Sequence, residues 1–275
     1  MIFRRNANLG PKLKISAWRR SAFALWRPAF DPSIYTWGEY EVAAAKKYLD
    51  GLQKSSGQKL TLTHFVAKAI AEMMRRHPEL NVMARWGSLY PRETVDLSFT
   101  VASDSKGEDL GSSIVHDAAS KSVLEIAAEL QPSVREVRAR RDPKHKVFKS
   151  VLSILPLRMR YWVLDFVTWI LFDWNLWHPL FGLPRNAFGC VLLTNIGSLG
   201  LEQGFAALIP STRIPMVVAM GAVQRKPVVR GDEIVIAEVI GLYFTVDHRL
   251  VDAVPAGYMS QTLKKIFLDP ENELR

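Results

Sequence analysis

The sequence almost lacks cysteine: Cys190 is the single thiol among 275 residues. One thiol cannot close an internal disulfide or build a thiolate metal cluster, so both frameworks are excluded within this chain. A reducing compartment is the simpler setting, and we predict a cytoplasmic location. Cys190 lies in an apolar stretch without an adjacent base, which predicts a buried core residue instead of a nucleophile.

Long hydrophobic runs are also missing. The most apolar stretch covers residues 161–172 and is interrupted by Asp165, whereas a membrane-spanning helix needs about 20 apolar residues. The N-terminus has basic residues without an apolar segment behind them, so it does not resemble a secretory signal. We therefore predict no spanning helix, and an interfacial helix peripheral to a membrane or a buried helix stays open.

Several motifs of common enzyme classes are absent, namely G-x-G-x-x-G, G-x-x-x-x-G-K-[ST] and G-x-S-x-G. Charge of one sign is in excess: 36 Lys and Arg stand against 27 Asp and Glu, a formal net charge of +9. This balance favours acidic partners such as phosphorylated cofactors, nucleic acid or an anionic membrane. Residues 1–30 are basic and aromatic, but they lack the repeats or recognition helix that mark nucleic-acid binding, so we predict no nucleic-acid partner.

Hydrophobic periodicity predicts a mixed α/β (α+β) fold with helices against a mixed β-sheet. Strands are expected at 34–42, 96–103, 114–115, 188–195, 215–221, 233–239 and 241–247. Helices are expected at 43–52, from a cap at Thr61 or Thr63 to His77, at 122–130 and after Asp252. Turns are expected at 106–107, 197–200 and 225–232.

Residues 136–185 differ in composition from both flanks. The stretch Arg135–Lys149 carries eight basic or histidine side chains, and four of the eight tryptophans follow it at Trp162, Trp169, Trp174 and Trp177. We interpret this segment as a helical apolar insertion in a single domain over 1–275, since it is too short to fold alone. It predicts an exposed apolar patch for a membrane surface or a protein partner, and the alternative is that it covers the protein's own sheet.

The segment that carries chemistry is Tyr243–Ala253, with the sequence YFTVDHRLVDA. His248 lies where a predicted strand meets a loop, so it is held firmly and can still reach a substrate. Histidine titrates near neutral pH and suits general-base work, although a structural role is the plain alternative. Asp252, four residues later, can orient the loop. The pair supplies two metal ligands at most, so we predict no metal site.

DHRLVDA resembles the Asp-His-Arg-x-x-Asp-Gly signature of the dihydrolipoyl acyltransferase component of 2-oxoacid dehydrogenase complexes, in its catalytic domain. The resemblance covers about residues 15–135 and 186–275 and is specific because several motifs follow in the family's order. These motifs lie at 59–82, 95–107, 114–130, 192–200, 216–253 and 263–274.

The resemblance implies a sandwich like chloramphenicol acetyltransferase and a homotrimer, or an assembly of trimers, with active sites between subunits. His248 would be the general base that takes a proton from the thiol of coenzyme A or dihydrolipoamide. The hydroxyl of Thr194 would stabilise the oxyanion, and Asn195 would orient substrate. Asp252 would be functional or structural, pairing with Arg19 or Arg20. A coenzyme A thioester is thus the expected substrate.

The chain also departs from the family pattern. We expect no lipoyl domain, lipoyl attachment or subunit-binding domain in it, Ala253 replaces a glycine, and 201–215 replaces the usual turn. Two hypotheses follow: an acyltransferase, or a non-catalytic trimeric scaffold or cage-forming protein that keeps the fold. The retained His248, Asp252 and Thr194 favour the enzyme.

Overall fold

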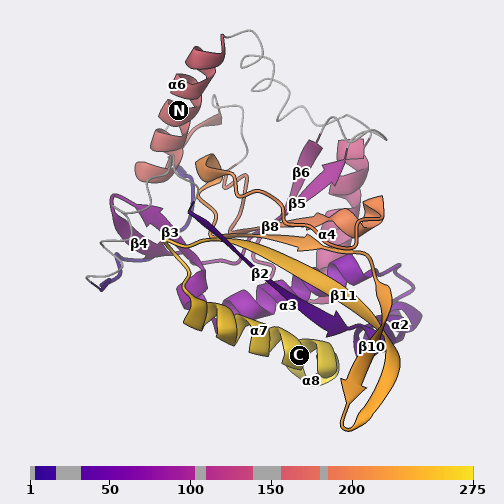
Figure 1. The fold of residues 1–275 in the computed structure, drawn as a ribbon. Helices are drawn as coiled ribbons and strands as arrows, with labels where there is room; N and C mark the ends of the chain where they lie inside the picture. Colours follow the sequence, from indigo (N-terminus) through magenta and orange to yellow (C-terminus); the bar gives the residue numbers. More distant parts are fainter. Residues whose placement is uncertain (1–3, 17–31, 103–109, 139–155, 180–184, 275) are drawn as a thin grey trace.

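A seven-stranded mixed sheet forms the centre of the protein (Figure 1). The computed structural model describes residues 4–16, 32–102, 110–138, 156–179 and 185–274. The strands of the sheet are β2 (Ser33–Glu41), β5 (Leu97–Ala102), β6 (Leu110–Val115), β8 (Val191–Asn195), β9 (Met216–Met220), β10 (Gln224–Arg230) and β11 (Glu233–Asp247). Their order is β10-β11-β9-β8-β5-β6, and β2 pairs with β11. The β5–β8 and β8–β9 pairs are parallel and the others antiparallel, as expected for a mixed sheet.

Helices cover one face of this sheet. They are α2 (Ala43–Ser56), α3 (Leu62–Arg76), α4 (Val123–Arg138), α7 (Ala253–Leu268) and the short α8 (Pro270–Glu273). The predicted cap of α3 is confirmed at Thr61, and its predicted apolar face, including Phe65, Ile70 and Met73, is fully buried. α3 packs between α4 and α7, so it forms the middle of the core.

The hairpin after β9 corrects two predictions. Residues 225–232 were expected to form a turn, but Gln224–Arg230 is a strand and the turn is Gly231-Asp232. The strands predicted at 233–239 and 241–247 are one continuous strand, β11. The reason is long-range: the basic side chains of β10 pair with acidic side chains of β2 across β11, Lys226 with Glu39 and Arg230 with Glu41.

Other boundaries moved by a few residues. β8 begins at Val191 and not at 188, because Gly189 adopts a left-handed φ of +61° and lies against the Asp96 carbonyl. α4 runs past 130 to Arg138 and contains Pro132, and α2 continues to Ser56. The turn expected at 197–200 is a short 3-10 helix, Ile196–Leu199. The turn predicted at 106–107 falls outside the described residues.

A second, smaller packing unit lies beside the sheet. It contains β1 (Arg4–Arg5) paired with β7 (Leu176–Trp177), the hairpin of β3 (Val82–Arg85) and β4 (Ser88–Pro91), the helix α6 (Leu157–Thr168) and the π-helix η2 (Trp169–Asp173). Its core consists of Ala7, Leu9, Met83, Leu171 and Phe172. α6 projects from the rest of the molecule at the top of Figure 1. Within the described ranges, no helix is long and apolar enough to cross a membrane.

Candidate functional site

His248 stands in a tight turn between β11 and α7. Its Nδ1 lies 3.2 Å from the carbonyl oxygen of Val251. Because a carbonyl oxygen can only accept, Nδ1 carries the proton and donates. The lone pair of the neutral ring is therefore on Nε2, the state that a general base requires. Asp252, the N-cap of α7, places Oδ1 3.6 Å from the same Nδ1 and supports this tautomer.

A buried ion pair fixes the turn that carries His248. The guanidinium of Arg249 donates to the Asp247 carboxylate from two nitrogens, from Nη2 at 2.6 Å and from Nε at 3.0 and 3.2 Å. Asp247 also accepts the backbone N–H of Arg249 at 2.9 Å. The backbone N–H of His248 donates to the Pro32 carbonyl at 2.9 Å, which ties the turn to the chain before β2. The histidine is thus positioned by buried contacts while its side chain remains 28% exposed.

Thr194 and Asn195 are the last residues of β8. The side-chain amide of Asn195 donates to the Thr63 hydroxyl at 3.0 Å, and its oxygen accepts the backbone N–H of Ser198 at 3.0 Å. These bonds orient Asn195 and close the turn after the strand. Thr194 is half-buried and lines a cavity of about 550 Å³ between the sheet and the helices α3 and α4.

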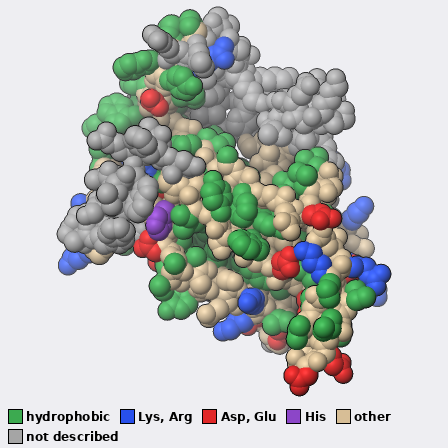
Figure 2. All heavy atoms as spheres, in the orientation of Figure 1, with side chains coloured by type: hydrophobic (Ala, Val, Ile, Leu, Met, Phe, Trp, Pro, Cys, Tyr) green, Lys and Arg blue, Asp and Glu red, His purple; other side chains and the backbone are tan. Residues whose placement is uncertain are grey.

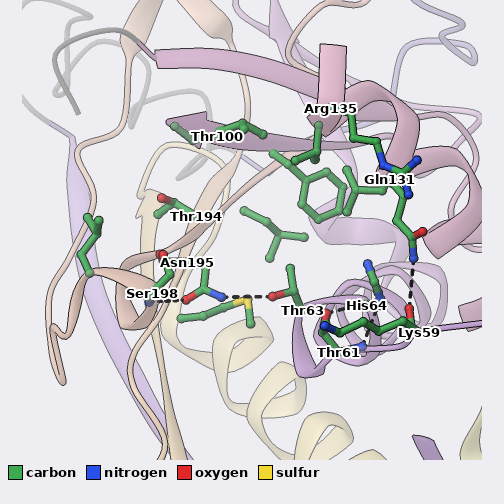
Figure 3. A pocket seen from close by; sticks show the side chains of 17 residues that line it. Lys59, Thr61, Thr63, His64, Thr100, Gln131, Arg135, Thr194, Asn195 and Ser198 are labelled. Atoms are coloured by element: carbon green, nitrogen blue, oxygen red, sulfur yellow. Dashed lines mark hydrogen bonds between the residues drawn. The ribbon is translucent and has the colours of Figure 1, made fainter. Parts of the chain in front are cut away.

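Polar and apolar walls alternate around this cavity (Figure 3). Thr194, Asn195 and Ser198 lie on one side, and Lys59, His64, Gln131 and Arg135 lie on the other. The apolar lining consists of Phe99, Val101, Leu130, Val134, Leu193, Leu199 and Met220. Sequence reasoning did not assign Lys59, His64, Gln131 or Arg135 to a site, because only the packing of α3 against α4 brings them together.

His248 does not line this cavity, and the sheet register explains why. Thr194 pairs with Ala219 of β9, whereas Val246, two residues before His248, pairs with Met216 at the other end of β9. About five residues along the strands and two strand spacings across place the two side chains roughly 15–20 Å apart. One chain therefore does not bring the predicted base and the predicted oxyanion donor together.

The remaining predicted residues have mixed outcomes. Arg19 and Arg20 lie outside the described residues. Cys190 is fully buried, and burial raises the pKa of its thiol to about 12, which fits the predicted core role. In the part of the chain that the structure describes, no three His, Cys, Asp or Glu side chains gather as metal ligands would.

A buried carboxylate anchors the segment that leads into β8. Asp96 accepts the backbone N–H of Asp117 at 2.8 Å and the Asn186 amide at 2.5 Å, and it lies 3.3 Å from Nδ1 of His116. The carbonyl of Asp96 also accepts the backbone N–H of Cys190 at 2.7 Å. Burial alone would raise the pKa of Asp96, but these hydrogen bonds outweigh it and lower the pKa to about 2. The hydrogen bond between His116 and Asp96 in turn raises the pKa of His116.

Asp96→Asn is expected to lower the free energy of unfolding at pH 7 by about 2 kcal/mol. This figure is the free energy that corresponds to the lowered pKa of the carboxylate. A depressed folded-state pKa stabilises above the ordinary value of 3.8 and loses this effect as the pH falls towards 2. The difference between variant and wild type should therefore shrink between pH 5 and pH 2. Urea unfolding across that range measures it. The exposed Asp50→Asn is the control, and a gap between Asp96→Asn and wild type that does not change with pH would contradict the assignment.

The order and direction of the strands can be compared with those of solved structures. Among solved structures the chain is similar to chloramphenicol acetyltransferase, at a TM-score of 0.55 and 14% identity over 94% of this chain and all of that one. It is also similar to the dihydrolipoamide acetyltransferase of Azotobacter vinelandii, at 0.66 and 16% identity over 97% and 95%. The cubic core of the pyruvate dehydrogenase multienzyme complex gives the same values. The predicted sandwich is thereby confirmed.

The chain belongs to the family of 2-oxoacid dehydrogenases acyltransferase (catalytic domain), which matches residues 22–154 and 187–274. A curated relative is the dihydrolipoyllysine-residue acetyltransferase component of the acetoin cleaving system of Bacillus subtilis (strain 168). It is 24% identical over 214 residues, which make up 78% of this chain and 43% of the relative. The chain spans less than half the length of the first curated relatives that it matches. Residues 155–186, which contain α6 and η2, lie between the two matched segments.

Proposed function

We propose that the protein is a cytoplasmic acyltransferase that moves an acyl group between a thioester of coenzyme A or dihydrolipoamide and an acceptor thiol. His248 is the general base and Thr194 the oxyanion donor. Two observations carry the proposal: the tautomer of His248 leaves Nε2 unprotonated, and Thr194 lines a cavity at the end of β8. The buried single cysteine fits a reducing compartment.

The work on the Azotobacter vinelandii enzyme supports these roles. It concerned a serine, a histidine and an asparagine in the catalytic mechanism of that enzyme, the asparagine four positions after the histidine. Asp252 stands four positions after His248 here. The serine precedes the histidine by 52 positions in that enzyme, and Thr194 precedes His248 by 54 positions in this chain. Threonine keeps the hydroxyl donor that the chemistry needs.

The reaction needs one proton acceptor and one oxyanion donor. Nε2 of His248 takes the proton from the acceptor thiol, and the resulting thiolate attacks the thioester carbonyl carbon. The hydroxyl of Thr194 donates to the oxygen that becomes negative in the tetrahedral intermediate. Collapse breaks the original carbon–sulfur bond, and the leaving thiolate takes the proton back from the His248 imidazolium.

We propose that a homotrimer, alone or in a larger assembly of trimers, forms the complete site. A ring of three subunits can bring His248 of one subunit beside Thr194 of the next, which one chain cannot do. Exposed apolar side chains support such an interface. Leu199 lines the cavity of Thr194, and Tyr35 on β2 contacts Phe205. The other exposed members are Trp37, Leu201 and Ile209. Hydrophobic side chains also gather at the centre of the face that β2 crosses in Figure 2.

A thiol-release assay tests the proposed reaction. Purified protein is incubated with a panel of acyl-coenzyme A thioesters and a dithiol acceptor, and the release of coenzyme A is followed with a thiol reagent. Turnover of at least one thioester is the expected result. Absence of turnover with every thioester, in a protein that forms trimers, would instead favour the scaffold.

A second role is favoured by the outer face of α6. Trp162, Phe166 and Trp169 follow at i, i+4 and i+7, so they share one face, and their exposed fractions are 79%, 59% and 41%. Trp174 and Trp86 extend this face through ring contacts at 5.7 Å. These exposed side chains lie in the segment for which an apolar patch was predicted, whereas Leu171 and Phe172 pack inward. Figure 2 shows hydrophobic side chains gathered on α6.

We propose that this face docks on an anionic membrane surface, because tryptophan favours the interface and the protein is basic. The double variant Trp162→Ala/Phe166→Ala is expected to lower co-sedimentation with phosphatidylglycerol vesicles about tenfold or more, given ~1.5–3 kcal/mol for each buried aromatic side chain. Neutral vesicles should retain less wild-type protein. Leu268→Ala, an equally exposed apolar change on α7, is the control. If the wild-type protein co-sediments with neither kind of vesicle, the membrane proposal is wrong and a protein partner is the alternative for this face.

A further inference from the structure

Two cations face the cavity on the wall opposite Thr194. Lys59 precedes α3 and Arg135 lies in the last turns of α4, and both side chains are exposed. The Gln131 amide holds the two elements together by donating to the Lys59 carbonyl at 3.0 Å. Neither cation forms an ion pair with any residue in the described ranges. Two like charges beside a cavity whose lining, within the part of the chain that the structure describes, contains no Asp or Glu favour an anionic ligand there.

His64 adds a neutral donor to the same wall. It is only 7% exposed, and its Nδ1 accepts the backbone N–H of Thr61 at 3.1 Å as part of the cap of α3. Burial lowers the pKa of His64, so the ring is neutral near pH 7. Because Nδ1 is the acceptor, the proton is on Nε2, which is thereby a donor. In Figure 3 the ring projects from α3 on the side of Lys59 and Arg135.

Between the two polar walls the lining is mostly apolar, with Thr63 and Thr100 as its polar members. Phe99, Leu130, Val134, Leu193 and Met220 offer no polar side-chain group to a ligand, apart from the thioether of the methionine. A ligand that fits has a polar reacting group at Thr194, a short apolar chain in the middle and an anionic end at the cations. The cavity volume of about 550 Å³ is in the range that holds a small ligand.

We propose that this cavity selects an acyl group that ends in a carboxylate, with Lys59, Arg135 and His64 receiving the carboxylate. The inference rests on the proposed function in one respect, namely that Thr194 marks the position of the acyl carbonyl. A carboxylate gains charge-assisted hydrogen bonds from the two cations, whereas a methyl end of the same chain length leaves them unpaired.

The test compares succinyl and butyryl thioesters, which have equal chain length and differ in the charge at the end. Both are offered as coenzyme A thioesters and as N-acetylcysteamine thioesters, which carry no phosphate. The expected result is a kcat/KM for the succinyl thioester about tenfold or more above the butyryl value in both series. Lys59→Met/Arg135→Met should abolish this preference by lowering the succinyl value alone. Lys54→Met, an exposed lysine on α2, is the control.

Two results would overturn the proposal. Equal use of succinyl and butyryl thioesters would show that no carboxylate is recognised. A loss on Lys59→Met/Arg135→Met that is confined to both coenzyme A thioesters would assign the cations to the phosphates of the coenzyme.

Binding separates this inference from the proposed reaction. Unreactive thioether analogues of the two N-acetylcysteamine substrates are titrated by calorimetry. Tighter binding of the carboxylate analogue, abolished in Lys59→Met/Arg135→Met, would support the subsite even if no thioester is turned over. Equal binding of the two analogues would reject it.

Discussion

His248→Ala is expected to lower turnover at least ~100-fold, which is the usual scale for a positioned general base. The substitution removes Nε2 and the proton transfer that it performs. It leaves the Asp247–Arg249 ion pair and the backbone N–H bond to Pro32, which fix the turn, so the fold should be retained. The thiol-release assay with the best thioester of the panel measures the loss.

The control for this variant is His116→Ala. It removes an exposed histidine that contacts Asp96 and is distant from His248 in the sequence. It should leave turnover near the wild-type value. Unimpaired turnover in His248→Ala, with the oligomeric state unchanged, would contradict the role of the base and move the chemistry to another group.

Mixing two inactive variants is expected to restore activity. Thr194→Val removes the hydroxyl at nearly constant volume. By itself it should cost about 3 kcal/mol of transition-state stabilisation, which lowers turnover ~100-fold. Co-expressed with His248→Ala, it leaves some interfaces with an intact His248 from one subunit and an intact Thr194 from the next. Random assembly of equal amounts predicts about a quarter of the wild-type activity.

The control for this experiment is the double variant His248→Ala/Thr194→Val co-expressed with wild type in the same ratio, which places both losses on one chain. That mixture should also contain about a quarter of intact interfaces, so the two activities should agree. Activity of the first mixture no higher than that of each variant alone would mean that both groups act within one subunit.

Local sequence was sufficient where the deciding neighbours are close along the chain. Thr61 caps α3 and Phe65, Ile70 and Met73 are buried as predicted, because cap and face lie within one helix. The position of His248 at the end of a strand followed from the pattern of Tyr243–Ala253 in the same way. Its role, and that of Thr194, came from the resemblance to the family.

The rest depended on contacts between distant residues. β10 was predicted as a basic turn because its acidic partners are distant in the sequence. Lys226 and Arg230 pair with Glu39 and Glu41 only once β2 is part of the sheet. His64 carried no signal in the sequence beyond its place in the predicted helix. Its place in a cavity with Arg135 requires α4 to be packed against α3, and no pattern within either segment encodes that contact.

β11 changes partners along its length, and this makes one strand into two regions of different local stability. Residues 242–246 have β2 on one side and β9 on the other, whereas residues 233–238 pair with β10 alone. Opening of residues 233–238 breaks one ladder only, and side chains there such as Ile234 already face solvent in the folded state. Amide protons should therefore exchange with solvent early in the hairpin and late near His248. The hairpin can adapt to a neighbour while the turn that carries His248, the proposed base, keeps its geometry.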